Sequence, residues 1–147
     1  MWKLNSTERL FQWRTFRKSL NVLSLETAIK SIAEFWANCP FTPYYLDPED
    51  YVNWPDPWTL IEENYYCDVA KALGILYTIK LTNHTPVLEM RVYCDRATNT
   101  YYNLVWVDNG KYVLNMVNGE VVNRIKIEPG LELRKVYGEQ ELKLSSY

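Results

Sequence analysis

The spacing of the apolar residues changes once along the chain, and that change limits what the chain can fold into. In residues 25–36 apolar side chains recur at i, i+3, i+4 and i+7, as on one face of a helix. Beyond His84 the period becomes two, and residues 87–94 alternate between an apolar set and a mixed set. Helices that come first and strands that follow, without alternation, are typical of the α+β class.

The helical part begins with a predicted pair of helices in residues 1–38. Ser6 or Thr7 is expected to cap the first helix and Ser24 the second, since their hydroxyl groups accept hydrogen bonds from free N–H groups of the first turn. A loop is expected over residues 39–56, because the segment "NCPFTPYYLDPEDYVNWPDP" carries a proline every few residues. Neither a helix nor a central strand continues through such a run.

A third helix is predicted over residues 57–80. Asp56 followed by Pro57 is a strong helix start, because the carboxylate caps the first turn and proline loses no needed donor there. Two faces of this helix are apolar, which indicates burial on most sides. Gly74 either lets a neighbouring backbone approach closely or ends the helix, and the β-rich residues 75–81 permit a strand as well.

The remaining residues, 86–138, predict an antiparallel meander of four to five strands. The turn Asn109-Gly110 supplies the positive φ values that hairpins need, and "VNG" at 117–119 and "EPG" at 128–130 mark further turns. A chain of 147 residues without low-complexity linkers is most simply one domain, 1–147.

Charge is segregated along the sequence although the net charge is only −2. Residues 1–20 are basic, and residues 31–70 hold acidic side chains but no Lys or Arg. Opposed fields can pair two segments within one fold or join neighbouring subunits, and a solvated surface explains them equally well. Aromatic residues reach 15%, which fits either extensive protein contacts or a core rich in tryptophan.

The cysteines and the N-terminus bear on the compartment. Cys39, Cys67 and Cys94 are odd in number and form no CxxC pair, which favours a reducing environment over a disulfide framework. The N-terminus carries Arg or Lys every few residues, unlike a signal peptide, and no apolar run approaches a membrane span. We therefore expect a soluble intracellular protein.

Catalysis would have to use Cys67, with His84 as the only imidazole in the chain. A reactive thiol needs a base, a cation or a helix N-terminus beside it. Inside one helix from Pro57, Cys67 is too far along for the dipole to help, and its neighbours are acidic. The sequence therefore favours a buried structural thiol over a nucleophile.

Metal and cofactor sites are not expected. Asp47, Glu49 and Asp50 cluster in one loop but lack the spacing and the glycine of a calcium loop, and no zinc pattern exists. There is no glycine-rich phosphate loop. Nucleic acid would have to bind the basic N-terminal helix through Trp13 and Phe16, and the net acidity makes a protein partner the better prediction.

Residues 56–116 resemble the core of the transglutaminase-like branch of papain-type cysteine enzymes. In that family a helix carries the nucleophilic cysteine, a histidine opens a strand, and an aspartate follows about fifteen residues later. Cys67 matches the cysteine, whereas Thr100 or its neighbours stand at the histidine position and Asn115 at the aspartate position. The resemblance thus implies a degenerate, inactive relative.

A second resemblance is to small proteins of tailed bacteriophages, in "QWRTFRKSL" and "NWPDPWTLIEENYYCDVAKALGILYTI". It implies a non-enzymatic structural or assembly protein of a neck, tail or baseplate, found in the host cytoplasm and then in the virion. The expected partners are other particle subunits or a second copy of the chain. The alternative is a transglutaminase-like cysteine hydrolase or acyltransferase that uses Cys67 and His84. The predicted interface residues are Tyr44, Tyr45, Tyr51, Trp54, Trp58, Trp13, Arg14 and Arg17.

Overall fold

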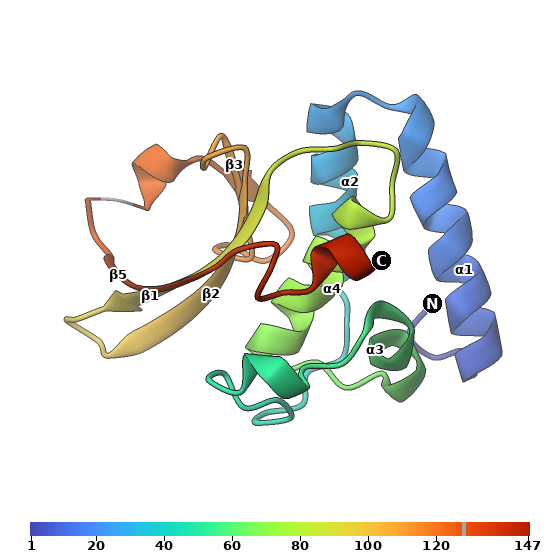
Figure 1. The fold of residues 1–147 in the computed structure, drawn as a ribbon, viewed down its shortest axis with the longest axis horizontal. Helices are drawn as coiled ribbons and strands as arrows, with labels where there is room; N and C mark the ends of the chain where they lie inside the picture. Colours follow the sequence, from blue (N-terminus) through green and yellow to red (C-terminus); the bar gives the residue numbers. More distant parts are fainter. Residues whose placement is uncertain (128) are drawn as a thin grey trace.

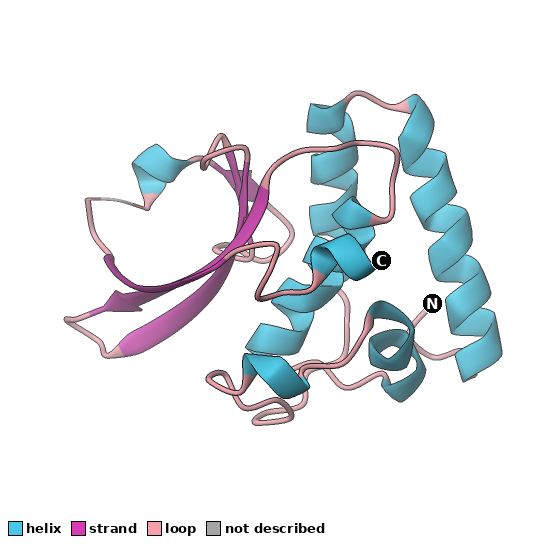
Figure 2. Ribbon diagram, viewed as in Figure 1, coloured by secondary structure: helices cyan, strands magenta, loops and turns pink. Residues whose placement is uncertain are grey.

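A computed structural model describes residues 1–127 and 129–147, and residue 128, within the predicted turn at 128–130, lies outside the described residues. A five-stranded antiparallel sheet forms one side of the molecule and the helices form the other (Figure 1; Figure 2). The helix α4 lies between the sheet and the remaining helices. The predicted α+β class is confirmed.

The helical part contains four α-helices where the sequence predicted three. They are α1 (Ser6–Ser19), α2 (Leu25–Trp36), α3 (Pro57–Glu63) and α4 (Asp68–Lys80). Short 3-10 turns also occur at η1 (Leu20–Val22), η2 (Tyr51–Asn53), η3 (Arg124–Lys126) and η4 (Leu144–Ser146). The predicted helix over 57–80 is therefore two helices.

Three of the helix starts follow ordinary capping chemistry. Ser24 and Asp56 accept hydrogen bonds from the N–H groups three residues on, as predicted. For α1 the cap is Asn5 rather than Ser6 or Thr7, and its Oδ1 accepts from the N–H of Glu8. The asparagine precedes both hydroxyl residues and caps a helix at least as well.

The sheet has the strand order β4-β3-β2-β1-β5. Its strands are β1 (Leu88–Asp95), β2 (Thr100–Val107), β3 (Tyr112–Leu114), β4 (Val121–Val122) and β5 (Glu132–Tyr137). The first four follow one another as hairpins, but β5 returns to pair with β1 at the opposite edge, so the sheet is not a simple meander.

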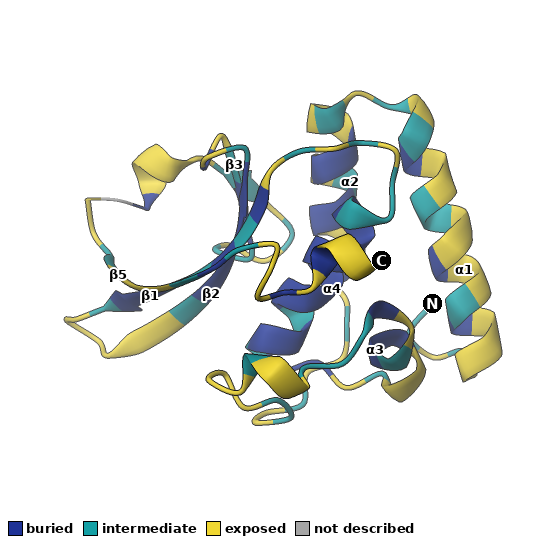
Figure 3. Ribbon diagram, viewed as in Figure 1, coloured by how far each residue is buried: buried dark blue, intermediate teal, exposed yellow. Residues whose placement is uncertain are grey.

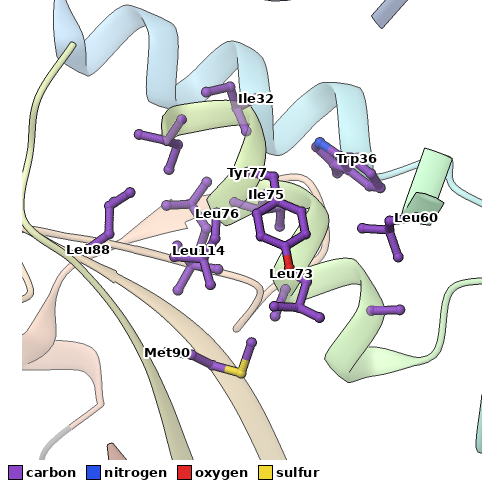
Figure 4. Packing of buried hydrophobic residues seen from close by; sticks show 14 of the residues in the cluster. Ile32, Trp36, Leu60, Leu73, Ile75, Leu76, Tyr77, Leu88, Met90 and Leu114 are labelled. Carbon is purple, nitrogen blue, oxygen red and sulfur yellow. The ribbon is translucent and has the colours of Figure 1, made fainter. Parts of the chain in front are cut away.

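The main core lies around α4, which is buried along nearly its whole length (Figure 3). Side chains of the sheet, such as Leu88 and Met90, meet one side of α4, and Ile32 and Trp36 of α2 meet the other (Figure 4). A smaller cluster around Trp106 packs on the other face of the sheet. Both faces of the sheet are thus covered, which explains why β2 reads as a nearly continuous apolar run.

The segment 75–81, for which the sequence left helix and strand open, continues α4 as far as Lys80. Gly74 neither ends the helix nor admits a backbone; instead the ring of Trp36 occupies the space where a side chain would project. Among the helices of the described chain, none is long and apolar enough to cross a membrane.

Candidate functional site

Cys67 lies at the start of α4, because the chain breaks its helix just before it. Asn64 ends α3 in the left-handed conformation (φ 59°), and Tyr66 then runs beside Phe41 as an isolated parallel bridge. Cys67 is the N-cap residue of α4. The prediction that Cys67 lies too far along one helix to meet its dipole is therefore wrong, since the thiol stands at the positive end of a new helix.

The thiol of Cys67 borders a pocket of about 1060 Å³ between the loop after α2 and the sheet. The loop side includes Leu46 and Glu49, and the sheet side includes Asn103 of β2 and Lys135 of β5. Only 6% of Cys67 is exposed to solvent, and the N–H of Leu46 donates to its Sγ at 3.4 Å. The thiol is thus shielded, as the sequence indicated, yet it faces a cavity large enough for a ligand.

Asp68 joins α4 to the sheet directly beside the thiol. Its Oδ2 accepts from the backbone N–H of Asn103 at 3.1 Å and from the Nδ2 of Asn103 at 2.8 Å, and its Oδ1 accepts from the Nδ2 of Asn115 at 3.1 Å. Asn115 also donates to the carbonyl oxygen of Asn103 at 2.9 Å. These bonds fix the N-terminus of α4 against β2 and satisfy a half-buried carboxylate.

His84 does not take part in this site. It follows the C-terminal end of α4, whereas Cys67 precedes its N-terminal end, and a helix of 13 residues is about 20 Å long. The Nε2 of His84 lies 3.0 Å from the carbonyl oxygen of Leu20. The pairing of Cys67 with His84 in the alternative prediction is therefore wrong, and the pocket holds no imidazole.

The residues that complete the site were only partly foreseen. Thr100 or its neighbours were predicted at the histidine position of the resemblance, and the neighbour Tyr101 does line the pocket with Cys67, as does Asn103, two residues further along β2. Asn115 does meet this cluster. The role of Asp68 was missed, although a carboxylate that begins a helix and a lone buried Asn in an apolar strand are both signals of a polar contact.

The predicted interface residues are spread over different environments. Trp13 is completely buried, so it contributes to no surface, and Arg17 lies over its ring with 4.2 Å between the guanidinium carbon and the centroid. Tyr44 and Trp58 are exposed, at 97% and 44%. The half-buried Tyr45, Tyr51 and Trp54 pack against the core, and Arg14 is exposed.

No family model matches the chain, and no curated protein sequence matches it either. Solved structures of LapG from Legionella pneumophila share its fold. One matches with a TM-score of 0.73 and 14% identity over 91% of this chain and 75% of LapG. The calcium-bound form matches with a TM-score of 0.72 and 13% identity, covering 94% and 82% of the two chains. The EGTA-treated form gives a TM-score of 0.68 and 13% identity over 91% and 74%.

LapG has a transglutaminase-like cysteine protease fold, and the predicted resemblance of this chain to that fold is supported. The prediction of a non-enzymatic structural or assembly protein of a phage particle is contradicted by these matches, as is the prediction that the chain is no enzyme. Nothing in the comparisons supports a phage origin. Of the aromatic residues predicted as interface anchors, Trp13 lies in the core and Tyr45, Tyr51 and Trp54 pack against it, whereas Tyr44 and Trp58 are exposed.

One of the matching LapG structures is calcium-bound, which raises the question of whether this chain can hold the ion. In residues 1–127 and 129–147 no group of three or more His, Cys, Asp or Glu side chains is arranged to hold a metal. Near the thiol, the Asp68 carboxylate is already taken up by amide donors. These residues do not fit a calcium site.

Proposed function

We propose that the chain is a thiol-dependent hydrolase or acyltransferase of transglutaminase-like type, with Cys67 as its nucleophile. The observation that carries the proposal is the position of Cys67, at the N-cap of a buried helix and on the wall of a pocket. The likeness of the fold to that of LapG supports it. The alternative prediction from the sequence is thereby kept for Cys67 and abandoned for His84.

The chemistry follows from what surrounds the sulfur. The sulfur attacks the carbonyl carbon of an acyl donor, an S–C bond forms, the bond to the leaving group breaks, and the thiol proton ends on the leaving group. Water or an amine then attacks the thioester, which returns the thiol. The first-turn N–H groups of α4 and the N–H of Leu46, which donates to the Sγ of Cys67, are the donors available at the thiol to stabilise the negative oxygen that develops in both steps.

Because the pocket contains no imidazole, the expected substrates are acyl donors with good leaving groups. The amide groups of Asn103 and Asn115 do not accept a proton at neutral pH, so the site offers no histidine base to Cys67. A donor with a good leaving group depends least on such a base. We therefore expect aryl esters and thioesters to acylate Cys67 faster than amides do.

Acylation by a neutral peptidyl aryl ester tests the proposal. Intact mass and peptide mapping are expected to show one acyl group on Cys67 and release of one equivalent of the phenol. The double variant Cys39→Ala and Cys94→Ala should keep this reaction, and Cys67→Ala should lose it. If folded wild-type protein acquires no more acyl groups than Cys67→Ala does, the proposal is wrong.

A further inference from the structure

The pocket beside Cys67 runs across the strands of the sheet, as the pairing register shows. Val92 of β1 pairs with Asn103 of β2 on one side and with Lys135 of β5 on the other. Directly paired residues share a face of the sheet, and all three line the pocket. Because neighbouring strands are about 4.8 Å apart, Lys135 stands about 10 Å from Asn103 across this wall.

The opposite wall, formed by the loop 41–49, runs the same way. It begins at the thiol, where the N–H of Leu46 donates to the Sγ of Cys67. It reaches β5 at Pro48, whose carbonyl oxygen accepts from the hydroxyl of Tyr137 at 3.2 Å. Glu49 follows directly on the same wall. The pocket therefore extends from the nucleophile to a far end between Glu49 and Lys135.

Four charged side chains line the pocket, and two of them are already engaged. The Asp68 carboxylate accepts from three N–H groups, and Arg134 forms an ion pair with Glu132 at 3.3 Å. Among the described residues, Lys135 and Glu49 form no ion pair. They remain available to a ligand at the far end of the pocket, one on each wall.

Tyr137 lies between these two charges as a neutral spacer. The ammonium of Lys135 lies 5.6 Å from the centroid of its ring. Burial raises the pKa of Tyr137, and the nearby Glu49 carboxylate raises it further, so the phenol keeps its proton. One wall therefore presents a positive side chain and the other a negative one, with the uncharged Tyr137 between them.

We propose that the pocket binds an extended polypeptide segment with two neighbouring residues of opposite charge, the acidic one against Lys135 and the basic one against Glu49. Successive side chains of an extended chain point to opposite sides, so neighbouring residues meet opposite walls. At about 3.3 Å per residue, a span of about 10 Å places this pair about three residues from the carbonyl group that meets Cys67. The inference rests on the proposed function for the position of that carbonyl.

Peptide binding to the Cys67→Ala variant tests the inference without any acylation. Fluorescent hexapeptides that differ only at one neighbouring pair, Asp-Lys or Ala-Ala, are titrated and followed by anisotropy. The Asp-Lys peptide is expected to bind about fivefold more tightly, and its advantage should fall as salt is raised. Equal affinities, or no binding of either peptide at millimolar concentration, would overturn the inference.

Charge reversal identifies the two residues. Lys135→Glu or Glu49→Lys, each made in the Cys67→Ala background, should abolish the preference for Asp-Lys, and the double exchange should transfer the preference to a peptide with the reversed pair, Lys-Asp. Lys111→Glu is the matched control, since Lys111 also lies over a tyrosine ring, at 5.5 Å from that of Tyr112, but does not line the pocket. If a charge reversal weakens binding of the Ala-Ala peptide as much as binding of the Asp-Lys peptide, the two side chains stabilise the pocket and do not recognise the ligand's charges. That result also contradicts the inference.

The two proposals fail separately. A preference for Asp-Lys without acylation of Cys67 by the neutral ester refutes the proposed function and keeps the binding site. Acylation of Cys67 without any charge preference among peptides refutes the binding site and keeps the function.

Discussion

At the scale of single residues, Thr78 connects three helices through one hydroxyl group. Its Oγ1 accepts from the indole N–H of Trp13 in α1 and of Trp36 in α2, each at 3.0 Å, and donates to the carbonyl oxygen of Gly74 at 2.6 Å. All of this lies in the core, where an unpaired donor costs about 1–3 kcal/mol. The tryptophans are tolerated there because this acceptor exists.

Thr78→Val removes the acceptor and keeps the shape of the side chain. Two buried indole N–H groups lose their partner, so we expect the free energy of unfolding to fall by about 2–5 kcal/mol. Thr82→Val is the matched control, because Thr82 is only half-buried at the end of α4, and it should cost less than about 1 kcal/mol. Urea denaturation followed by tryptophan fluorescence measures both. Equal losses in the two variants would contradict the prediction.

The residue that most distinguishes this site from a histidine-assisted one is Asn103. Under the proposed function, Asn103→His combined with Asn115→Asp places an imidazole on the pocket wall and a carboxylate in the polar cluster next to it. A positioned general base raises a reaction rate by about 100-fold or more. We therefore expect acylation of Cys67 by the aryl ester to become as much as about 100-fold faster. The rate should also acquire an inflection near about pH 6.5, where a histidine titrates.

Asn118→His is the control for this gain, because Asn118 is exposed and does not line the pocket. Circular dichroism must first establish that the double variant is folded, since it gives up the side-chain hydrogen bonds from Asn103 and Asn115 to Asp68 and from Asn115 to the carbonyl oxygen of Asn103. A folded double variant that reacts no faster than wild type would show that β2 does not present this position to the thiol.

At the scale of elements, the close approach of α2 to α4 depends on Gly74. A Cβ atom at this position would lie 2.2 Å from the nearest ring atom of Trp36. Overpacking of this kind costs about 1–3 kcal/mol, although alanine is the better helix former by about 1 kcal/mol. Because the indole of Trp36 is also held by Thr78, it cannot easily move away.

Gly74→Ala is therefore expected to lower the free energy of unfolding by about 1–3 kcal/mol, measured by urea denaturation. Gly130→Ala, where no atom lies within 4 Å of the added Cβ, should change it by less than about 0.5 kcal/mol. A Gly74→Ala protein as stable as wild type would mean that the helices separate at little cost.

The elements themselves were predictable where one local rule acted alone. The apolar stripe of α2, the start of α3 at Asp56 and the hairpin turn at Asn109-Gly110 all follow from spacing and turn chemistry. The break between α3 and α4 was missed, because the apolar spacing continues across it. Asn64 was its only local sign, since asparagine readily adopts the left-handed conformation that ends a helix.

The site was less predictable than the elements because it depends on contacts distant in sequence. The contact of Asp68 with Asn103 joins residues 35 positions apart, and that with Asn115 joins residues 47 apart. Spacing within one segment carries no information on such pairs. Trp13 shows the same limit, since its burial depends on an acceptor in α4 rather than on its own helix.

At the scale of the whole molecule, the basic segment 1–20 and the acidic segment 31–70 meet within one fold, and between the described residues of these two segments the contact is not an ion pair of side chains. Arg9 of the basic segment donates to the carbonyl oxygens of Ile61 and Glu62, at 3.1 and 2.7 Å, in the last turn of α3. A cation at the C-terminal end of a helix is stabilised by the free carbonyl groups there. The side chain of Arg9 thus attaches the first helix to the backbone of the acidic segment.

Stability of the whole fold should decline at alkaline pH, because buried acids must stay protonated. Burial raises the pKa of the Cys39 thiol from 9.0 to about 11, with a smaller opposite effect from Lys71. Between about pH 9 and 11 the unfolded chain therefore loses this proton while the native chain keeps it, so the free energy of unfolding falls as pH rises. Below about pH 8 both states hold the proton, and Cys39 contributes no pH dependence.

Cys39→Ser removes this titration and should flatten the decline between about pH 9 and 10, as measured by urea denaturation at a series of pH values. Above about pH 10 the decline should persist in the variant, because burial also raises the pKa of Tyr66 and of Tyr77. A general loss of stability from the substitution lowers the whole curve without changing its slope. Equal slopes for wild type and Cys39→Ser between pH 9 and 10 would therefore contradict the assignment, since only the thiol separates the two proteins in that interval.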